Sequence, residues 1–245
     1  MIDFAAPAPE RFAYALENFA RTQSSIGTYN ERSMHAFLKQ YIEPDTNYHE
    51  VPVGRFVADI CNGEEICEIQ TSQVFRMRDK LTHFLEHSRV TLVCPLIRRH
   101  YTAKYDPETG EFLSVRITPR RGYPQDIALS LSPIRDLLAN DNLRVWVPYL
   151  DVTDLRPFTE KGKRGKKTDT IPRELADAWY ITCPRDLLQF LPENLADGFT
   201  TKDVSLAAKC HLDSAQSLMT LLHHFSLVTR ERQGNRGYAY TLPKE

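Results

Sequence analysis

Two carboxylates and an amide stand on either side of one predicted hairpin turn. Asp59 lies in a strand-like run, and Glu68 and Gln70 lie in the next run, after Asn62 and Gly63. Asn-Gly between two such runs is a strong signal for a tight hairpin. Because side chains alternate along a strand, Glu68 and Gln70 share one face and can meet Asp59 at one sheet edge. Two carboxylates, completed by water and phosphate oxygens, suit a hard cation such as Mg²⁺.

The elements that must position these residues follow the order α-β-β-β-α-β. Apolar residues at helical spacing and runs rich in β-branched residues give this order. We expect helices over 31–42 and 72–86, and strands over 48–53, 55–61, 65–71 and 90–97.

Further elements complete a first domain, which we place at residues 1–158. A helix over 9–22 precedes the others, and a hairpin of strands 101–105 and 111–118 follows them. Residues 106–110 have turn chemistry throughout. A helix near 126–139 and an apolar run over 143–150 come last. The fold class predicted for this domain is α/β (α+β).

The D-x8-E-x-Q pattern of Asp59, Glu68 and Gln70, in this order of elements, resembles the PD-(D/E)xK nuclease superfamily. It is similar to the variant in which glutamine replaces the usual lysine. The resemblance covers about residues 25–100 and implies a restriction-endonuclease-like mixed sheet flanked by helices. It also implies that Asp59 and Glu68 bind the metal and that Gln70 helps to orient the attacking water.

Many members of this superfamily add an acidic residue on the helix before the first strand, and Glu31 fits that position. Glu31, His35 and Leu38 form an i, i+4, i+7 row beside the apolar stripe, which turns Glu31 toward the sheet. His35 shares this row, so we expect it at the edge of the site. There it could donate a hydrogen bond to a phosphate, or it could lie beside the sheet with its hydrogen bonds made to the protein.

The sequence departs from the superfamily pattern at two positions. Ala58 replaces the proline, and Gln70 replaces the lysine. Glutamine neither titrates nor carries charge, so the metal would have to supply the hydroxide and the charge stabilisation. Each acid also has a plain explanation, as a turn-proximal acid, the solvated face of an edge strand, or a residue favouring a helix N-terminus. We favour the metal site because three residues converge within a matching topology.

Basic residues outside this constellation could bind phosphates. Arg120 and Arg121 follow the hairpin strands and could reach a phosphate near the site. A run of five cations in seven residues comprises Lys161, Lys163, Arg164, Lys166 and Lys167. Such a run would release counterions on binding a phosphate backbone, although a solvated linker explains it equally well. We expect a basic linker over 159–172.

The C-terminal residues 173–245 show the order expected of a winged helix. Helices begin at Thr200 or Thr201 and at Asp213, and a hairpin spans about 228–242. Gln216 would lie on the outer face of the second helix, with Arg230, Arg232 and Arg236 on or near the wing. That helix contains no Arg or Lys, which disfavours sequence-specific reading of bases. Wing-and-backbone contact with nucleic acid and a protein-binding role both remain open.

Composition sets the remaining limits. The 245 residues allow one or two domains, at about 150 residues per domain. A net charge of -1 means that any nucleic acid must be bound by local patches. Five cysteines without a CxxC pair indicate reduced thiols. Since no signal peptide or long apolar run is seen, we expect a cytoplasmic protein without membrane contact, and the lack of a dinucleotide fingerprint predicts no organic cofactor.

These patterns together predict a nuclease that depends on Mg²⁺ or Mn²⁺ and hydrolyses phosphodiester bonds in nucleic acid, DNA rather than RNA. Many such enzymes dimerise to cut both strands, so a homodimer is expected by analogy. The alternative is a non-catalytic winged-helix regulator that binds nucleic acid or protein and carries a degenerate nuclease-like domain.

Overall fold

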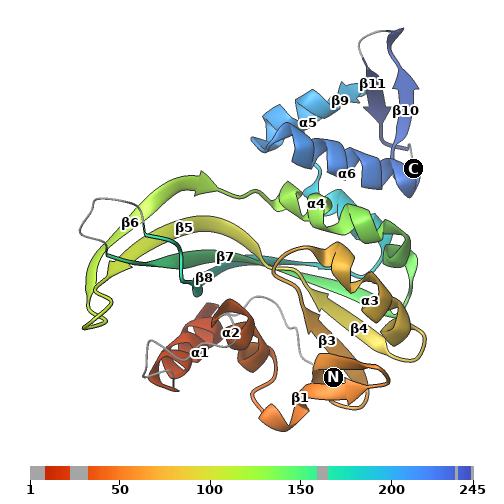
Figure 1. Ribbon diagram of the computed structural model, residues 1–245. Helices are drawn as coiled ribbons and strands as arrows, with labels where there is room; N and C mark the ends of the chain where they lie inside the picture. Colours follow the sequence, from red (N-terminus) through yellow and green to blue (C-terminus); the bar gives the residue numbers. More distant parts are fainter. Residues whose placement is uncertain (1–8, 23–32, 159–164, 235–236, 244–245) are drawn as a thin grey trace.

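The computed structural model describes residues 9–22, 33–158, 165–234 and 237–243. A large mixed sheet runs through the molecule with helices on both of its faces (Figure 1). A smaller group of C-terminal helices and strands lies over one of these faces. The expected α/β class is therefore confirmed. No helix in the described part of the chain is long and apolar enough to cross a membrane.

The first part of the sheet is a meander followed by a parallel strand. Its strands are β1 (His49–Val53), β2 (Phe56–Cys61), β3 (Glu65–Ile69) and β4 (Arg89–Val93). β1, β2 and β3 pair antiparallel, whereas β4 pairs parallel to β3. Gly54 and Gly63 make the two turns with φ of +58° and +90°, a backbone region that favours glycine.

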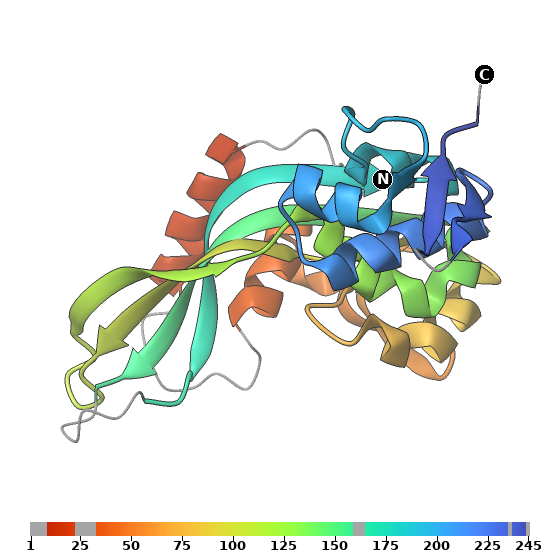
Figure 2. The ribbon, with the colours of Figure 1, turned by 90° about the horizontal axis from the view of Figure 1, so that it is seen from above.

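The second part of the sheet is an arm that curves away from the first (Figure 2). Its strands are β5 (Leu96–Tyr105), β6 (Phe112–Arg121), β7 (Leu143–Pro157) and β8 (Asp169–Ile181). β7 joins the two parts, because β4 and then β5 pair with successive stretches of one of its edges. β8 pairs along the other edge of β7, and β6 pairs with β5.

Two hydrophobic clusters hold helices against opposite faces of the sheet. α1 (Pro9–Thr22) and α2 (Ser33–Ile42) pack on one face through buried Phe12, Phe37 and Leu38. On the other face, η2 (Val74–Met77), α3 (Arg78–Leu85), α4 (Ile127–Leu131) and η4 (Ser132–Ala139) contribute to a larger cluster. In each case the apolar residues recur at helical spacing, so one stripe of the helix is buried.

β8 corrects the expected domain boundary. The predicted linker is wrong over 169–172, and so is the start of a separate domain at 173, because β8 pairs with β7 from Leu155↔Asp169 to Val145↔Ile181; residues 159–164 of that linker lie outside the described residues. The segment contains Glu, Leu and Ala, which favour helix, and two register shifts in its pairing break the alternation of a regular strand. Pairing along the long neighbouring strand overrides that local preference.

The C-terminal group begins after η5 (Pro184–Phe190). It comprises β9 (Phe199–Thr200), α5 (Thr201–Ala208), α6 (Leu212–His224), β10 (Thr229–Arg232) and β11 (Tyr238–Thr241). Thr200 and Asp203 form a capping box at the start of α5. The small sheet has the order β10-β11-β9. This is the helix, helix and hairpin order that the sequence predicts, and the assignment as a winged helix stays a prediction.

α6 joins the C-terminal group to the main sheet. Its buried residues Leu218 and Leu222 belong to the same cluster as Val90 and Val145 of the sheet. Ser214 donates a hydrogen bond of 2.5 Å to Asp126, which precedes α4. The inner face of α6 is therefore used for packing, and the C-terminal group shares a core with the sheet.

Candidate active site

A cleft of about 630 Å³ lies where β2 and β3 separate. The ladder between these strands pairs Ile60 with Cys67 and Cys61 with Ile66. Asp59 and Glu68 are the next residues beyond the last pair, and both line the cleft. Side-chain carboxylates thus stand at the point where the two strands stop pairing.

The two carboxylates are bonded to the opposite backbone rather than to each other. The Asp59 N–H donates to Oε1 of Glu68 at 3.1 Å, and the Ile69 N–H donates to Oδ2 of Asp59 at 2.7 Å. These bonds take the place of the missing ladder bonds. They hold the two acids side by side at the cleft. Glu68 is completely buried there.

Helices from opposite faces of the sheet each supply one partner. Nε2 of His35, on α2, lies 3.2 Å from Oδ2 of Asp59. Nζ of Lys80, on α3, lies 2.5 Å from Oε2 of Glu68. Each acid therefore has its own nitrogen partner, and both hydrophobic clusters must form for this arrangement to exist.

Burial and mutual repulsion make the two acids titrate differently. Burial, followed by the negative charge of Asp59, raises the pKa of Glu68 to about 7, although Lys80 opposes the rise. Burial also raises the pKa of Asp59, but the hydrogen bond and charge of His35, the Ile69 N–H and Lys80 together bring that pKa below its usual value. The environments push the two pKa values apart, as is common at functional sites.

Gln70 and three cations complete the part of the cleft that could meet a substrate. Gln70 lines the cleft, and its Nε2 donates to the carbonyl oxygen of Ser72. Arg55 of the β1–β2 turn and Arg76 of η2 line the same cleft together with Lys80. The cleft therefore presents both carboxylates and cations, which is the combination needed to hold a metal and a phosphate.

Lys80 is not among the site residues predicted from the sequence. The signal for it was the apolar stripe of the predicted helix over 72–86, because Lys80 stands next to Leu81 and one turn before Phe84. A cation at the border of such a stripe can run its stem along the apolar surface and place its charge beside the sheet. Nζ of Lys80 indeed lies 5.7 Å from the centre of the Phe84 ring.

Several expected site residues fall outside the described part of the chain. They are Glu31, Lys161, Lys163, Arg164 and Arg236. The structure therefore brings together Asp59, Glu68, Gln70 and His35 of the predicted constellation. Among the residues that it describes, no group of three or more His, Cys, Asp or Glu side chains is arranged to hold a metal.

The other basic residues proposed for nucleic-acid binding lie elsewhere. Arg120 and Arg121 are exposed near the end of β6, and Lys166 is exposed before β8. Lys167 pairs with Asp154 at 3.5 Å. In the C-terminal group Gln216 and Arg232 are exposed, and Arg230 lies 4.6 Å from the centre of the Tyr238 ring. None of these seven residues is among those that line the carboxylate cleft.

Comparison with protein families decides where the chain belongs. A family model described as a domain of unknown function, DUF8091, matches residues 32–181, which is more than half of the chain. The chain belongs to this family. The DUF8091 region starts beside α2 and ends with β8, so it includes Asp59, Glu68 and Lys80 and leaves out the C-terminal group. Its end agrees with the boundary set by β8.

A relative of the DUF8091 protein occurs in Treponema pallidum (strain Nichols). It is 28% identical over 155 residues, which are 62% of this chain and 61% of the relative, and it is described as an uncharacterized protein. The alignment thus spans less than two thirds of the relative. No solved structure matches.

Proposed function

We propose that this DUF8091 protein is a divalent-metal-dependent nuclease that hydrolyses phosphodiester bonds in nucleic acid, with DNA as its expected substrate. The observation that supports this most is the pair Asp59 and Glu68 at the open end of β2 and β3, with Lys80 in an ion pair with Glu68. The α-β-β-β-α-β order of α2, β1, β2, β3, α3 and β4 is the order that the resemblance to the PD-(D/E)xK superfamily requires. All five cysteines are free thiols, in keeping with the cytoplasmic location that we also propose.

The carboxylate pair fits a hard divalent cation. Mg²⁺ is commonly bound by one or two carboxylates, with water and substrate phosphate as the other ligands, so a third protein acid is not needed. Burial and the nearby charge of Asp59 raise the pKa of Glu68, and a bound cation would offset both effects. Asp59 and Glu68 would hold Mg²⁺ or Mn²⁺, which would supply Lewis-acid stabilisation and activate water for attack.

The protein side chains then have distinct parts in the reaction. His35 holds Asp59 in place through the 3.2 Å contact. Lys80 places a fixed positive charge at Glu68, in the cleft where charge would develop on the phosphate. Lys80 thereby supplies, from α3, the positive side-chain charge that Gln70 lacks. Gln70 would orient water, and Arg55 and Arg76 would bind phosphates flanking the cleaved bond.

Cleavage assays test the proposed function directly. Plasmid, linear DNA and RNA are incubated with the full chain and Mn²⁺ or Mg²⁺, and in parallel with EDTA. We expect cleavage of DNA with metal and none with EDTA, because neither Gln70 nor Lys80 can replace the cation as a source of activated water. DNA that is retarded on a gel but stays intact would instead support the non-catalytic binding protein.

Replacing Lys80 with methionine tests the part given to its charge. Methionine keeps the unbranched stem beside Phe84, so the packing of α3 should persist. We expect the cleavage rate to fall by about 100-fold, as when one preorganised charge or donor is removed from an active site. Lys202→Met, on the exposed surface of α5, is the matched control and should cleave like the wild type. Equal rates for both variants would remove Lys80 from the mechanism.

A further inference from the structure

A second cavity adjoins the carboxylate cleft on the α2 side of the sheet. Its volume is about 370 Å³, which is in the range of small-molecule sites. Thr71 lines both cavities, and the consecutive residues Met34 and His35 of α2 line the second cavity and the cleft, respectively. A nucleic-acid strand with a phosphate at Asp59 could therefore place a neighbouring group in the second cavity.

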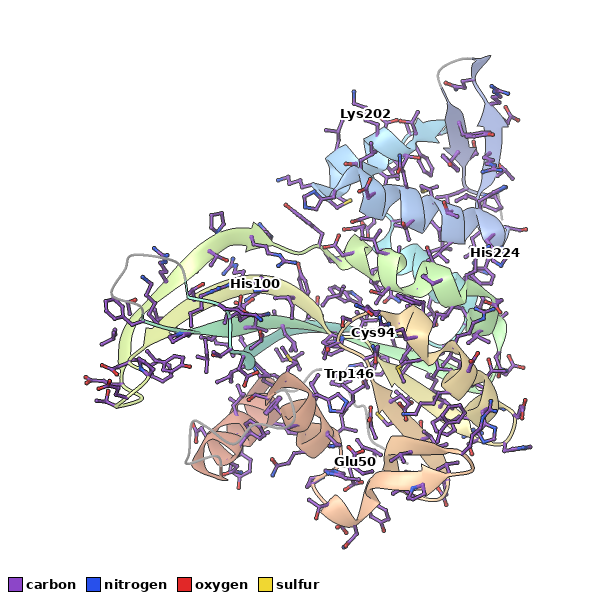
Figure 3. The ribbon with its side chains drawn as sticks, viewed as in Figure 1. Glu50, Cys94, His100, Trp146, Lys202 and His224 are labelled. Carbon is purple, nitrogen blue, oxygen red and sulfur yellow. The ribbon has the colours of Figure 1, made fainter. Side chains whose placement is uncertain are left out.

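His100 gives this cavity a polar wall. It lies on β5 in the arm of the sheet (Figure 3). Near it, the pairing of β5 shifts register with both neighbouring strands. The shift against β7 lies between Ile97 and Arg99, and the shift against β6 lies between Arg99 and Tyr101. Such irregularities re-aim side chains and are frequent beside active sites. The residue His100 is 8% exposed, and it lines the cavity.

Asp154 fixes the orientation and the tautomer of His100. Nδ1 of His100 lies 3.0 Å from Oδ2 of Asp154, and the hydroxyl of Thr170 donates to the other carboxylate oxygen at 2.8 Å. Because a carboxylate accepts, Nδ1 donates to Asp154, and in this tautomer Nε2 is left as the hydrogen-bond acceptor of the ring. Within the described residues, no protein donor is bonded to that Nε2. Asp154 therefore holds the ring in place and leaves Nε2 able to accept a hydrogen bond from a ligand.

Part of the lining is apolar, and each of its charged groups already has a hydrogen-bond or ion-pair partner. Met34, Pro95 and Ile97 form the apolar wall. Asp154 is satisfied by His100, Thr170 and Lys167, while Asp169 accepts from the hydroxyl of Ser33 and from the N–H of Thr170. Asp169 adds a carboxylate to the wall, and the cation of the wall, Lys167, is already paired with Asp154, so a second phosphate is disfavoured. A flat, neutral ring with apolar faces and a polar edge suits this lining better.

We propose that this cavity binds a nucleobase of the same strand whose phosphate lies at Asp59 and Glu68. The base would pack against Met34 and Ile97 and donate an N–H to Nε2 of His100. This inference rests on the proposed nuclease function and deepens it, because a base can enter only from a single strand or after leaving the duplex stack. The substrate would then be single-stranded or locally opened nucleic acid.

Binding to strands with and without bases tests the inference. Fluorescently labelled single strands of DNA and RNA, and a strand of the same length in which every sugar lacks its base, are titrated with the full chain in EDTA, and anisotropy is measured. We expect about tenfold tighter binding of the base-bearing strands, a typical effect of holding one base on a protein surface. His100→Asn keeps a donor toward Asp154 and removes the acceptor at Nε2, so it should lose most of this preference and bind the abasic strand like the wild type.

Controls separate the failure of this inference from the failure of the proposed function. His87→Asn, on the surface after α3, should keep the full preference. If His100→Asn does not fold, Ile97→Phe, which fills the cavity from its apolar wall, should abolish the preference. Equal binding of base-bearing and abasic strands, or an unchanged preference in His100→Asn, would overturn the base pocket while leaving metal-dependent cleavage untouched. A chain that neither binds nor cuts any strand would overturn both proposals.

Discussion

Replacing Asp59 with asparagine is expected to lower the rate of metal-dependent cleavage by at least about 100-fold while the protein stays folded. The amide oxygen of asparagine can still accept the hydrogen bond from the Ile69 N–H, which holds Asp59 at 2.7 Å. The negative charge that would bind the cation is lost. Because that charge also raises the pKa of Glu68, the pKa of Glu68 should move down toward its usual value in the variant.

Initial cleavage rates at saturating Mn²⁺ measure the loss of activity, and a thermal melt checks that the variant stays folded. Asp141→Asn, in the exposed turn before β7, removes an equal charge at a distance and serves as the control. It should cleave at the wild-type rate. If Asp59→Asn cut nucleic acid as fast as Asp141→Asn, Asp59 would have no part in binding the metal, and the proposed active site would have to be abandoned.

Replacing Glu68 with glutamine is expected to stabilise the metal-free protein above pH 7 and to abolish cleavage. The pKa of Glu68 is raised from 4.5 to about 7, so between these values the folded chain holds a proton that the unfolded chain releases. Stability therefore falls as the pH rises through this window, and the loss is complete above about pH 7. Glutamine has no charge to bury and can still accept from the Asp59 N–H. The gain in unfolding free energy should be about 1–3 kcal/mol, after the lost partner of Lys80 is taken into account.

Urea unfolding in EDTA, at about pH 5 and above pH 7, measures this gain. The difference between variant and wild type should be small at the lower pH, where Glu68 is protonated in the folded state, and largest at the higher pH. Mn²⁺ should then stabilise the wild type but not the variant, because a ligand stabilises only the folded form that binds it. Parallel pH profiles for the two proteins would show that Glu68 is not strained by its surroundings.

The order of elements around the site could be predicted from the sequence because each element carries its own local signal. The Asn62-Gly63 turn fixed the hairpin of β2 and β3, and the recurring apolar residues fixed α2 and α3. β8 could not be predicted in this way. It mixes residues that favour helix with residues that favour strand, and two register shifts in its pairing with β7 break the regular alternation that would have marked it.

The site itself was predictable only in part, for a related reason. Asp59 and Glu68 are brought together by a local turn, which a sequence displays. Lys80 reaches Glu68 because α3 packs across the opposite face of the sheet from α2, and His100 lines a cavity because register shifts turn it there. Contacts of this kind depend on how separate elements dock, and a single sequence carries no direct record of docking.

Because His35 and Lys80 are carried by helices anchored in two separate hydrophobic clusters, the carboxylate pair can be completed only after both clusters have consolidated. A chain that has formed one of them has a lone acid at the strand ends without its nitrogen partner. Under the proposed function, catalytic competence would therefore arise late in maturation, and half-assembled molecules emerging from synthesis would be unable to cut nucleic acid.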